Sequence, residues 1–238
     1  VTANSVICGL LEEMVIGSPP INSNPTEYVG SSWFGNNYNH EFRKRIQDIC
    51  VRLGDYLRTQ GFIGVFHPDF LFGDNGEIFL TELNMRFGGS CGVINRFEMK
   101  MIKIPYMLQN IFSFDDRLVE IDPTLLNERN LHPINWGLLI LKNYFGKPIK
   151  LNKQFESGIY KIVGSRIEFT GVIDFEKFND PDLIYISGLP NGEVDTVVEE
   201  NAFICEIITQ KPMSNSQSKL NQYGVDLANI IFEQIILK

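Results

Sequence analysis

Residues 61–90, GFIGVFHPDFLFGDNGEIFLTELNMRFGGS, predict two neighbouring strands around a tight turn. The first strand is expected from Phe62 to Phe72, and the second runs towards Arg86. Between them, residues 74–76 (Asp-Asn-Gly) accept the positive φ angles that a hairpin turn requires. This hairpin carries most of the information in the chain about fold and function.

Alternate residues of a strand share a face, so the pattern places polar side chains together on each strand. Asp69, Glu82 and Asn84 supply oxygen ligands and Arg86 a guanidinium. Carboxylate and amide oxygens suit Mg²⁺, and a neighbouring arginine suits phosphate. The sequence therefore predicts a magnesium–nucleotide site on faces formed by Ile63, Val65, His67, Asp69 and Leu71, and by Ile78, Leu80, Glu82, Asn84 and Arg86.

The same alternation also describes the solvated face of an ordinary antiparallel hairpin. Two details favour the site. The opposite faces are not cleanly polar or apolar, and the polar cluster ends beside Gly88 and Gly89, where a backbone can approach a ligand closely. The residues that oppose the acidic face are Phe66, Pro68, Phe70 and Phe72 in the first strand, and Phe79, Leu83 and Met85 in the second.

This stretch resembles the second lobe of ATP-grasp enzymes, in particular the carboxylate–amine ligases. The likeness rests on an acidic residue, Asp69, thirteen residues before Glu82. It also rests on residues 84–89, which fit the pattern Asn-x-Arg-x-Gly-Gly, and on residues 67–69, which fit His-x-acidic. The match is specific across about thirty residues and weaker outside them.

The resemblance implies an α+β fold in two parts. Residues 1–120 would form the C-terminal ATP-grasp lobe, an antiparallel sheet with helices, and residues 121–238 a small α+β domain. The boundary falls in a charged, turn-rich stretch at 115–131. Because the chain starts inside what resembles the second lobe, the N-terminal lobe is expected to be missing, and this piece alone is expected to be inactive.

The resemblance also implies an ADP-forming ligase. ATP would convert a carboxylate substrate into an acyl-phosphate, which an amine substrate then attacks, with amino acids as candidate substrates. Asp69, Glu82 and Asn84 would hold one or two Mg²⁺, for which Mn²⁺ can substitute. Arg86 and His67 would act in catalysis, and Arg86 with Gly88 and Gly89 would bind the nucleotide.

Two alternatives stay open at the sequence level. The chain could be a degenerate ATP-grasp-like module that binds a nucleotide or a partner without ligation. It could also be an unrelated α+β binding module in which the polar cluster is coincidental. Nucleotide binding separates the first two interpretations from the third, and amine-dependent ADP release separates the ligase from the degenerate module.

Composition excludes several other classes. A formal charge of −8 over 238 residues disfavours a general nucleic-acid surface and an anionic membrane surface. Apolar stretches are interrupted by charge before they reach bilayer length. Four scattered cysteines without a Cys-x-x-Cys motif predict a reduced, cytoplasmic protein, and oligomeric assembly is left open.

The remaining elements follow from periodicity and composition. Helices are expected at 41–60, where apolar residues recur at helical spacing, at 132–144 and at 217–237. Residues 17–37, rich in Pro, Ser and Asn, predict a loop. Strands are expected at 5–16, 158–163, 167–173, 183–186 and 202–209.

Overall fold

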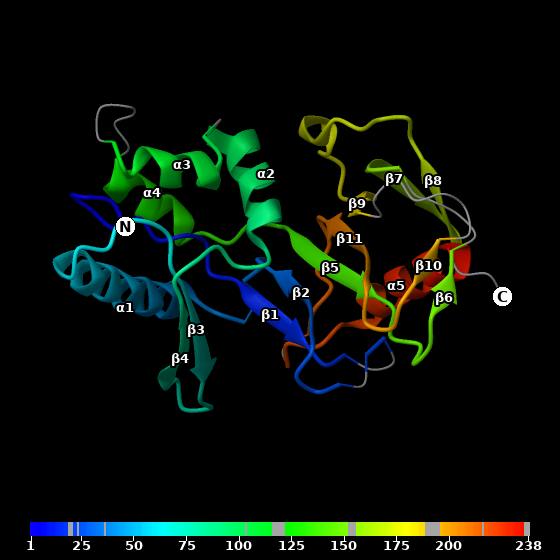
Figure 1. Ribbon diagram of the computed structural model, residues 1–238, viewed down its shortest axis with the longest axis horizontal. Coiled ribbons are helices and arrows are strands. Elements are labelled where there is room, and N and C mark those ends of the chain that lie inside the picture. Colours follow the sequence, from blue (N-terminus) through cyan, green and yellow to red (C-terminus); the bar gives the residue numbers. More distant parts are fainter. Residues whose placement is uncertain are drawn as a thin grey trace. The chain divides into compact units, whose positions relative to one another are not determined.

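The computed structural model describes residues 1–238 except 19–20, 23, 36, 103, 116–121, 152–155, 189–195, 216 and 236–238. The chain forms two compact units (Figure 1). The first comprises Val1–Leu11 and Asn36–Pro133, and the second comprises Glu12–Gly35 and Ile134–Lys238. The chain therefore passes between the units three times.

This division differs from the expected domains 1–120 and 121–238. Residues 12–35 belong to the second unit because the strand within them pairs with a strand more than a hundred residues later, with Gly30 opposite Leu139. Residues 121–133 belong to the first unit because their helix holds the N-terminal segment, with Asn127 donating to the Val6 carbonyl. Long-range pairing of this kind leaves no mark in local composition.

The first unit combines helices with one hairpin. Its described elements are α1 (His40–Thr59), β3 (His67–Phe72), β4 (Ile78–Asn84), α2 (Cys91–Ile102), α3 (Tyr106–Phe112) and α4 (Pro123–Asn130). The helix expected at 41–60 is confirmed as α1. The Asn39 side chain accepts from the Phe42 amide at its start, and Gly61 follows its end with φ +84°. Both ends thus carry the residues that helix termini favour.

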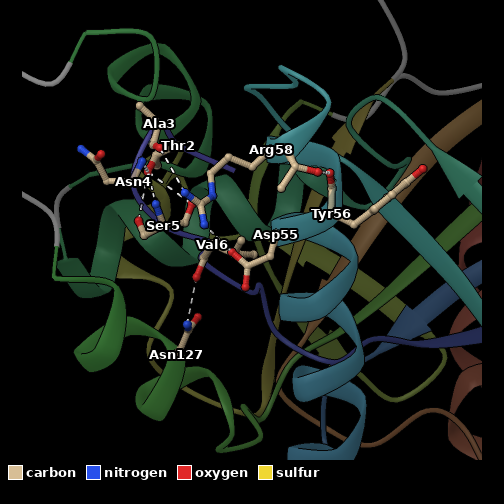
Figure 2. Close-up of polar contacts among 10 residues, drawn as sticks. Thr2, Ala3, Asn4, Ser5, Val6, Asp55, Tyr56, Arg58 and Asn127 are labelled. Carbon is tan, nitrogen blue, oxygen red and sulfur yellow. Dashed lines mark hydrogen bonds and ion pairs between the residues drawn. The ribbon is translucent and has the colours of Figure 1, made fainter.

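The N-terminal segment is held by polar contacts from α1 and α4, as Figure 2 shows. Arg58 of α1 donates to the Ala3 carbonyl at 3.5 Å, and Asn127 of α4 donates to the Val6 carbonyl at 3.0 Å. Gly54 of α1 lets the segment approach, because an added Cβ would lie 2.7 Å from a Val6 methyl. The segment therefore packs into the unit without forming a strand of its own.

An antiparallel sheet of seven described strands organises the second unit. Its order is β1-β2-β5-β11-β9-β7-β8, and every neighbouring pair is antiparallel. The strands are β1 (Glu13–Ile16), β2 (Tyr28–Ser32), β5 (Gly137–Lys142), β7 (Gly158–Val163), β8 (Arg166–Phe169), β9 (Leu183–Gly188) and β11 (Phe203–Thr209). The short strands β6 (Ile149–Lys150) and β10 (Val197–Val198) pair with each other.

Both faces of this sheet are covered within the unit. One face presents Leu139, Ile186 and Ile207 to helix α5 (Gln222–Ile235), which contributes Leu227 and Ile231 to the same fully buried core. On the other face, Tyr185 meets an aromatic group in which the Trp136 and Phe175 rings lie 5.1 Å apart, and a 3₁₀ turn at Phe175–Lys177 supplies part of that group. Burial on both sides explains the continuous apolar run of β5.

The helix expected at 132–144 is wrong. Residues 137–142 form β5, which lies between β2 and β11 in the sheet. A short apolar run such as Leu-Leu-Ile-Leu is compatible with a buried helix or with a strand covered on both faces, and periodicity does not separate the two. This run forms a strand because it pairs with β2 and β11 and is buried in the sheet.

The loop expected at 17–37 is also wrong in part, because β2 occupies Tyr28–Ser32. Its serines are buried in the sheet, although their composition suggested a turn. The strand expected at 5–16 shrinks to β1 at 13–16, and the turn-rich stretch at 115–131 contains α4, which Asp122 caps and Pro123 begins. Helices α2 and α3 had no counterpart in the sequence prediction.

The other predicted elements are confirmed within a few residues. The strands expected at 158–163, 167–173, 183–186 and 202–209 correspond to β7, β8, β9 and β11. The final helix is α5, shorter than the predicted span of 217–237, whose last two residues fall outside the described part of the chain. The fold is α+β, as expected, with a mainly antiparallel sheet and helices. None of the helices in the described ranges is long and apolar enough to cross a membrane.

Candidate functional site: the β3–β4 hairpin

The register of the β3–β4 hairpin brings four predicted site residues onto one face. His67 lies opposite Asn84, and Asp69 lies opposite Glu82. Residues directly opposite each other in an antiparallel pair share a face, as do residues two apart in one strand. The expected convergence of these four side chains is therefore what the backbone produces.

The register also corrects one part of the expected faces. The pairing shifts between Asp69 and Phe70, so that Phe70 lies opposite Leu80 and Thr81 is the extra residue of a β-bulge. Leu80 consequently shares a face with Phe70 and not with Glu82, contrary to strict alternation along the strand. The bulge lies directly beside the acidic pair, where such irregularities commonly re-aim side chains.

The other face of the hairpin anchors it to α1. The Phe72 ring lies 4.9 Å from the Phe42 ring and 5.2 Å from the Tyr38 ring, both in edge-to-face contact. The turn is tied down as well, because Arg45 donates to the Gly76 carbonyl at 3.1 Å. Packing of the apolar face against a capped helix leaves the polar face of the hairpin available.

Asp69 is the centre of the polar cluster. Its carboxylate lies 3.2 Å from His67 Nδ1 and accepts from Asn84 Nδ2 at 3.2 Å, and Asp69 lies opposite Glu82 in the hairpin. Burial raises the pKa of the Asp69 carboxyl above its ordinary value of 3.8, with His67 opposing the shift and Glu82 adding to it. Two carboxylates at facing strand positions repel each other when both are ionised, and a cation between them would relieve that repulsion.

The oxygen donors of the cluster suit a hard cation, provided that the Asn84 side-chain amide changes its orientation. The Asn84 amide directs its nitrogen at Asp69, so its oxygen would face a shared ion only after the amide turns over. Among the residues described, no group of three or more His, Cys, Asp or Glu side chains is arranged to hold a metal ion. Asp69, Glu82 and Asn84 offer two carboxylates and one amide, donors that suit Mg²⁺ or Mn²⁺ better than zinc.

Gly88 closes the cluster on the side of His67. A Cβ added at Gly88 would lie 3.0 Å from both Cδ2 and Nε2 of the imidazole, which is tighter than ordinary contact. The absence of a side chain at this position therefore lets His67 lie where it reaches Asp69. The sequence predicted a close backbone approach at this glycine, and the approach found is to His67.

Residues 88–90 lead directly into helix α2. The Cys91 amide donates to the Gly88 carbonyl at 3.2 Å, and the Val93 amide donates to the carbonyl of buried Ser90 at 3.0 Å. The site is thus followed by a helix N-terminus, which the sequence prediction missed. A serine before an apolar stretch is a helix-start pattern that could have revealed it.

Two of the predicted site residues lie apart from the contacts of the cluster. Arg86 is exposed just beyond β4, and its guanidinium donates to the neighbouring Phe87 carbonyl at 3.1 Å. Gly89 is exposed in the turn before α2. The structure therefore brings together His67, Asp69, Glu82, Asn84 and Gly88, and leaves Arg86 and Gly89 at the margin.

Comparisons with known proteins give a distant likeness. Neither a protein-family model nor a curated protein sequence matches the chain. The structure is similar to a solved biotin carboxylase domain of a single-chain bacterial carboxylase, with a TM-score of 0.49 and 8% sequence identity. The likeness covers 87% of this chain and 40% of that one, so this chain spans well under half the length of its structural neighbour.

Proposed function

We propose that the β3–β4 hairpin is the metal and phosphate site of an ATP-dependent, ADP-forming carboxylate–amine ligase. The observation that carries the proposal is the Asp69–Glu82 pair, whose carboxylates occupy facing positions of the two strands. Like charges directly opposite each other in a sheet repel, and a cation between the two groups would remove that repulsion. A cation site explains why the chain keeps this pair.

Asp69, Glu82 and Asn84 would hold one or two Mg²⁺ in this proposal, and Mn²⁺ could replace them. A cation bound there would neutralise the charge on the phosphate oxygens of ATP. His67 would serve the site by orienting the Asp69 carboxylate through the 3.2 Å contact. Residues that hydrogen-bond the ligands of a metal commonly have this role. The imidazole ring of His67 lies against the backbone of Gly88.

The remaining residues would act on the substrates. Arg86, exposed at the end of β4, can swing from the Phe87 carbonyl to a phosphoryl group, for which its planar fork is suited. The backbone amides at Gly88 and Gly89 would take the acyl oxygen of the carboxylate substrate. In the reaction the carboxylate attacks the γ-phosphate, and the amine then displaces phosphate from the acyl-phosphate.

A second candidate is a nucleotide-binding module without ligase activity. One observation favours it: the Arg86 guanidinium bonds its own neighbour's carbonyl and lies outside the contacts of the acidic cluster. A module of this kind would keep the cation and phosphate contacts of the hairpin and lack the clamp on the transferring group. Binding assays alone would not distinguish it from the ligase, and a chemical assay does.

Binding is tested first, by isothermal titration of ATP in the presence and absence of Mg²⁺. Wild type should bind ATP in a Mg²⁺-dependent manner, and Glu82→Gln should lose that dependence while keeping its circular dichroism spectrum. Asp74→Asn is the matched control, since it makes the same change in charge at the exposed turn of the same hairpin. Equal Mg²⁺-dependence in Glu82→Gln and Asp74→Asn would refute the site.

Chemistry is tested by ADP release from the full-length gene product, against a panel of small carboxylates and amines that includes amino acids. Hydroxylamine in place of the amine should trap the acyl-phosphate as a hydroxamate. Release that requires both a carboxylate and an amine establishes the ligase. Mg²⁺-dependent ATP binding without hydroxamate or ADP, over the same panel, would replace the ligase by the non-catalytic module.

A further inference from the structure

The two ends of the β3–β4 hairpin follow different registers. Between the turn and Phe70, which lies opposite Leu80, each step along β3 is matched by one step back along β4. On the other side of the bulge, Asp69 lies opposite Glu82, one residue further along β4 than the register of the turn gives. The facing positions of the two carboxylates therefore depend on the extra residue, Thr81.

A hairpin that kept the register of the turn throughout would take the candidate site apart. Strict pairing counted from the turn would place Asp69 opposite Thr81 and Pro68 opposite Glu82. A slip of one residue moves every side chain of a strand to the other face. Glu82 and Asn84 would then lie on the face that packs against α1, and Asp69 would lose both of its partners from β4.

The register beside the turn is held by contacts of its own. The Gly73 amide donates to the Glu77 carbonyl at 3.0 Å, and the Gly76 amide donates to the Gly73 carbonyl at 2.9 Å. From α1, the Arg45 side chain donates to the Gly76 carbonyl at 3.1 Å. Because these bonds fix the turn, the change of register has to be made within β4, at the bulge.

The Thr81 side chain holds the bulge in place. Its hydroxyl donates to the backbone carbonyl of Asp69 at 3.0 Å, so it bonds the residue at which the register changes. A bulge locally disrupts the ladder of backbone hydrogen bonds between two strands. The threonine hydroxyl therefore supplies a bond between β3 and β4 at the point where the ladder is interrupted.

We propose that Thr81 is a positioning residue of the candidate cation site, an inference that rests on the proposed function of that site. Its hydroxyl stabilises the bulged register, which brings Glu82 and Asn84 onto the face of the hairpin that carries His67 and Asp69. Thr81 acts through the Asp69 backbone and not on the cation or the nucleotide. The two carboxylates thereby keep the facing positions that would let them share a cation.

The register is tested in the whole chain by nuclear magnetic resonance, without ATP. Cross-strand Overhauser effects that pair His67 with Asn84 report the bulged register, and effects that pair His67 with Leu83 report the register without a bulge. Wild type should show the first set. Thr81→Val keeps the β-branched shape and removes the hydroxyl, so it should weaken that set, whereas Thr81→Ser should retain it.

Deletion of Thr81 separates the hydroxyl from the facing positions that it supports. Without the extra residue, regular pairing continued from the turn places Glu82 opposite Asp69 and Asn84 opposite His67. The deletion variant should therefore keep Mg²⁺-dependent ATP binding although it lacks the hydroxyl. Thr81→Val should instead reduce the affinity about fivefold, as the loss of one hydrogen bond predicts.

Thr170→Val is the matched control. The Thr170 hydroxyl donates to the Ile159 carbonyl at 2.9 Å, so the same substitution removes the same kind of bond from the second unit. Both valine variants should lose similar stability in urea titrations, and only Thr81→Val should lose affinity for ATP.

The inference is overturned if Thr81→Val keeps both the wild-type Overhauser effects and the wild-type affinity. It is also overturned if Thr81→Ser loses as much affinity as Thr81→Val, because the hydroxyl would then not be the cause. If wild type shows the bulged register and binds no ATP, the proposed function fails, and the effect of Thr81→Val on the register still decides whether Thr81 holds the acidic pair in place.

Discussion

Gly88→Ala is the sharpest small perturbation of the candidate site. The added methyl carbon would lie 3.0 Å from His67 Cδ2 and Nε2, and 3.3 Å from Cε1. Carbon atoms prefer separations of about 3.5–4.0 Å, so the imidazole must retreat by roughly 0.5 Å. Gly88 is absent from the glycines with positive φ, so the backbone itself accepts alanine. The change therefore acts on His67.

The consequence for the site follows from one distance. His67 Nδ1 lies 3.2 Å from Asp69 Oδ1, already at the long end of a hydrogen bond. A further lengthening removes most of that interaction, which contributes about 1 kcal/mol at such a partly exposed position. If His67 orients Asp69 for a cation, Mg²⁺-dependent ATP binding should weaken by about fivefold, which corresponds to that free energy.

Gly92→Ala is the matched control, because none of the described residues would lie within 4 Å of its added Cβ. Both variants are titrated with ATP at a fixed excess of Mg²⁺, and their thermal unfolding is recorded without ligand. Gly88→Ala should lose affinity at nearly unchanged unfolding temperature, and Gly92→Ala should retain affinity. Equal affinities in the two variants would show that His67 has no part in cation binding.

Three further predictions concern the first unit. Gly54→Ala should lower the free energy of unfolding by about 1–3 kcal/mol in urea titrations, because its Cβ would lie 2.7 Å from Val6; an unchanged midpoint would contradict that packing. Arg129→Ala should lower it by about 3 kcal/mol, because it leaves the carboxylate of Glu98, 3% exposed, without its ion pair. Burial raises the pKa of Glu98 above its ordinary value of 4.5. Between the ordinary pKa and the raised pKa the folded state binds more protons than the unfolded state, so the free energy of unfolding falls as the pH rises through this range. Glu98→Gln should flatten this part of a pH series of urea titrations, and a slope equal to that of wild type would refute the assignment.

Local rules predicted the site better than the architecture around it. His67 shares a face with Asp69, and Glu82 with Asn84, because of the two-residue period of a strand, which can be recognised in the sequence. The bulge at Thr81, which brings the two pairs onto one face, could not be recognised in that way. It depends on how the two strands are paired, which the residue pattern of one strand does not reveal.

The main errors have a common physical origin. β5 is apolar on both faces because the sheet is covered on both sides, and the sequence alone does not reveal that covering. β2 contains serines whose backbone groups pair with distant strands, so their local preference for turns is overridden. By contrast, α1 carries its own cap, its own apolar stripe and a terminal glycine, and its limits were predicted within one residue.

The pairing of β2 with β5 constrains how the protein folds during translation and how its two units can be produced separately. Gly30 fits against the Leu138 carbonyl, where an added Cβ would lie only 2.0 Å away, so the two strands interlock closely. During translation, β2 leaves the ribosome long before β5, and the Asn36–Pro133 stretch of the first unit is made in between. The second unit must wait for its central strand, and closing so long a loop slows folding. A gene truncated before β5 would leave β1 and β2 without their partner, and each unit could be produced separately only by joining its two stretches of chain with a new linker.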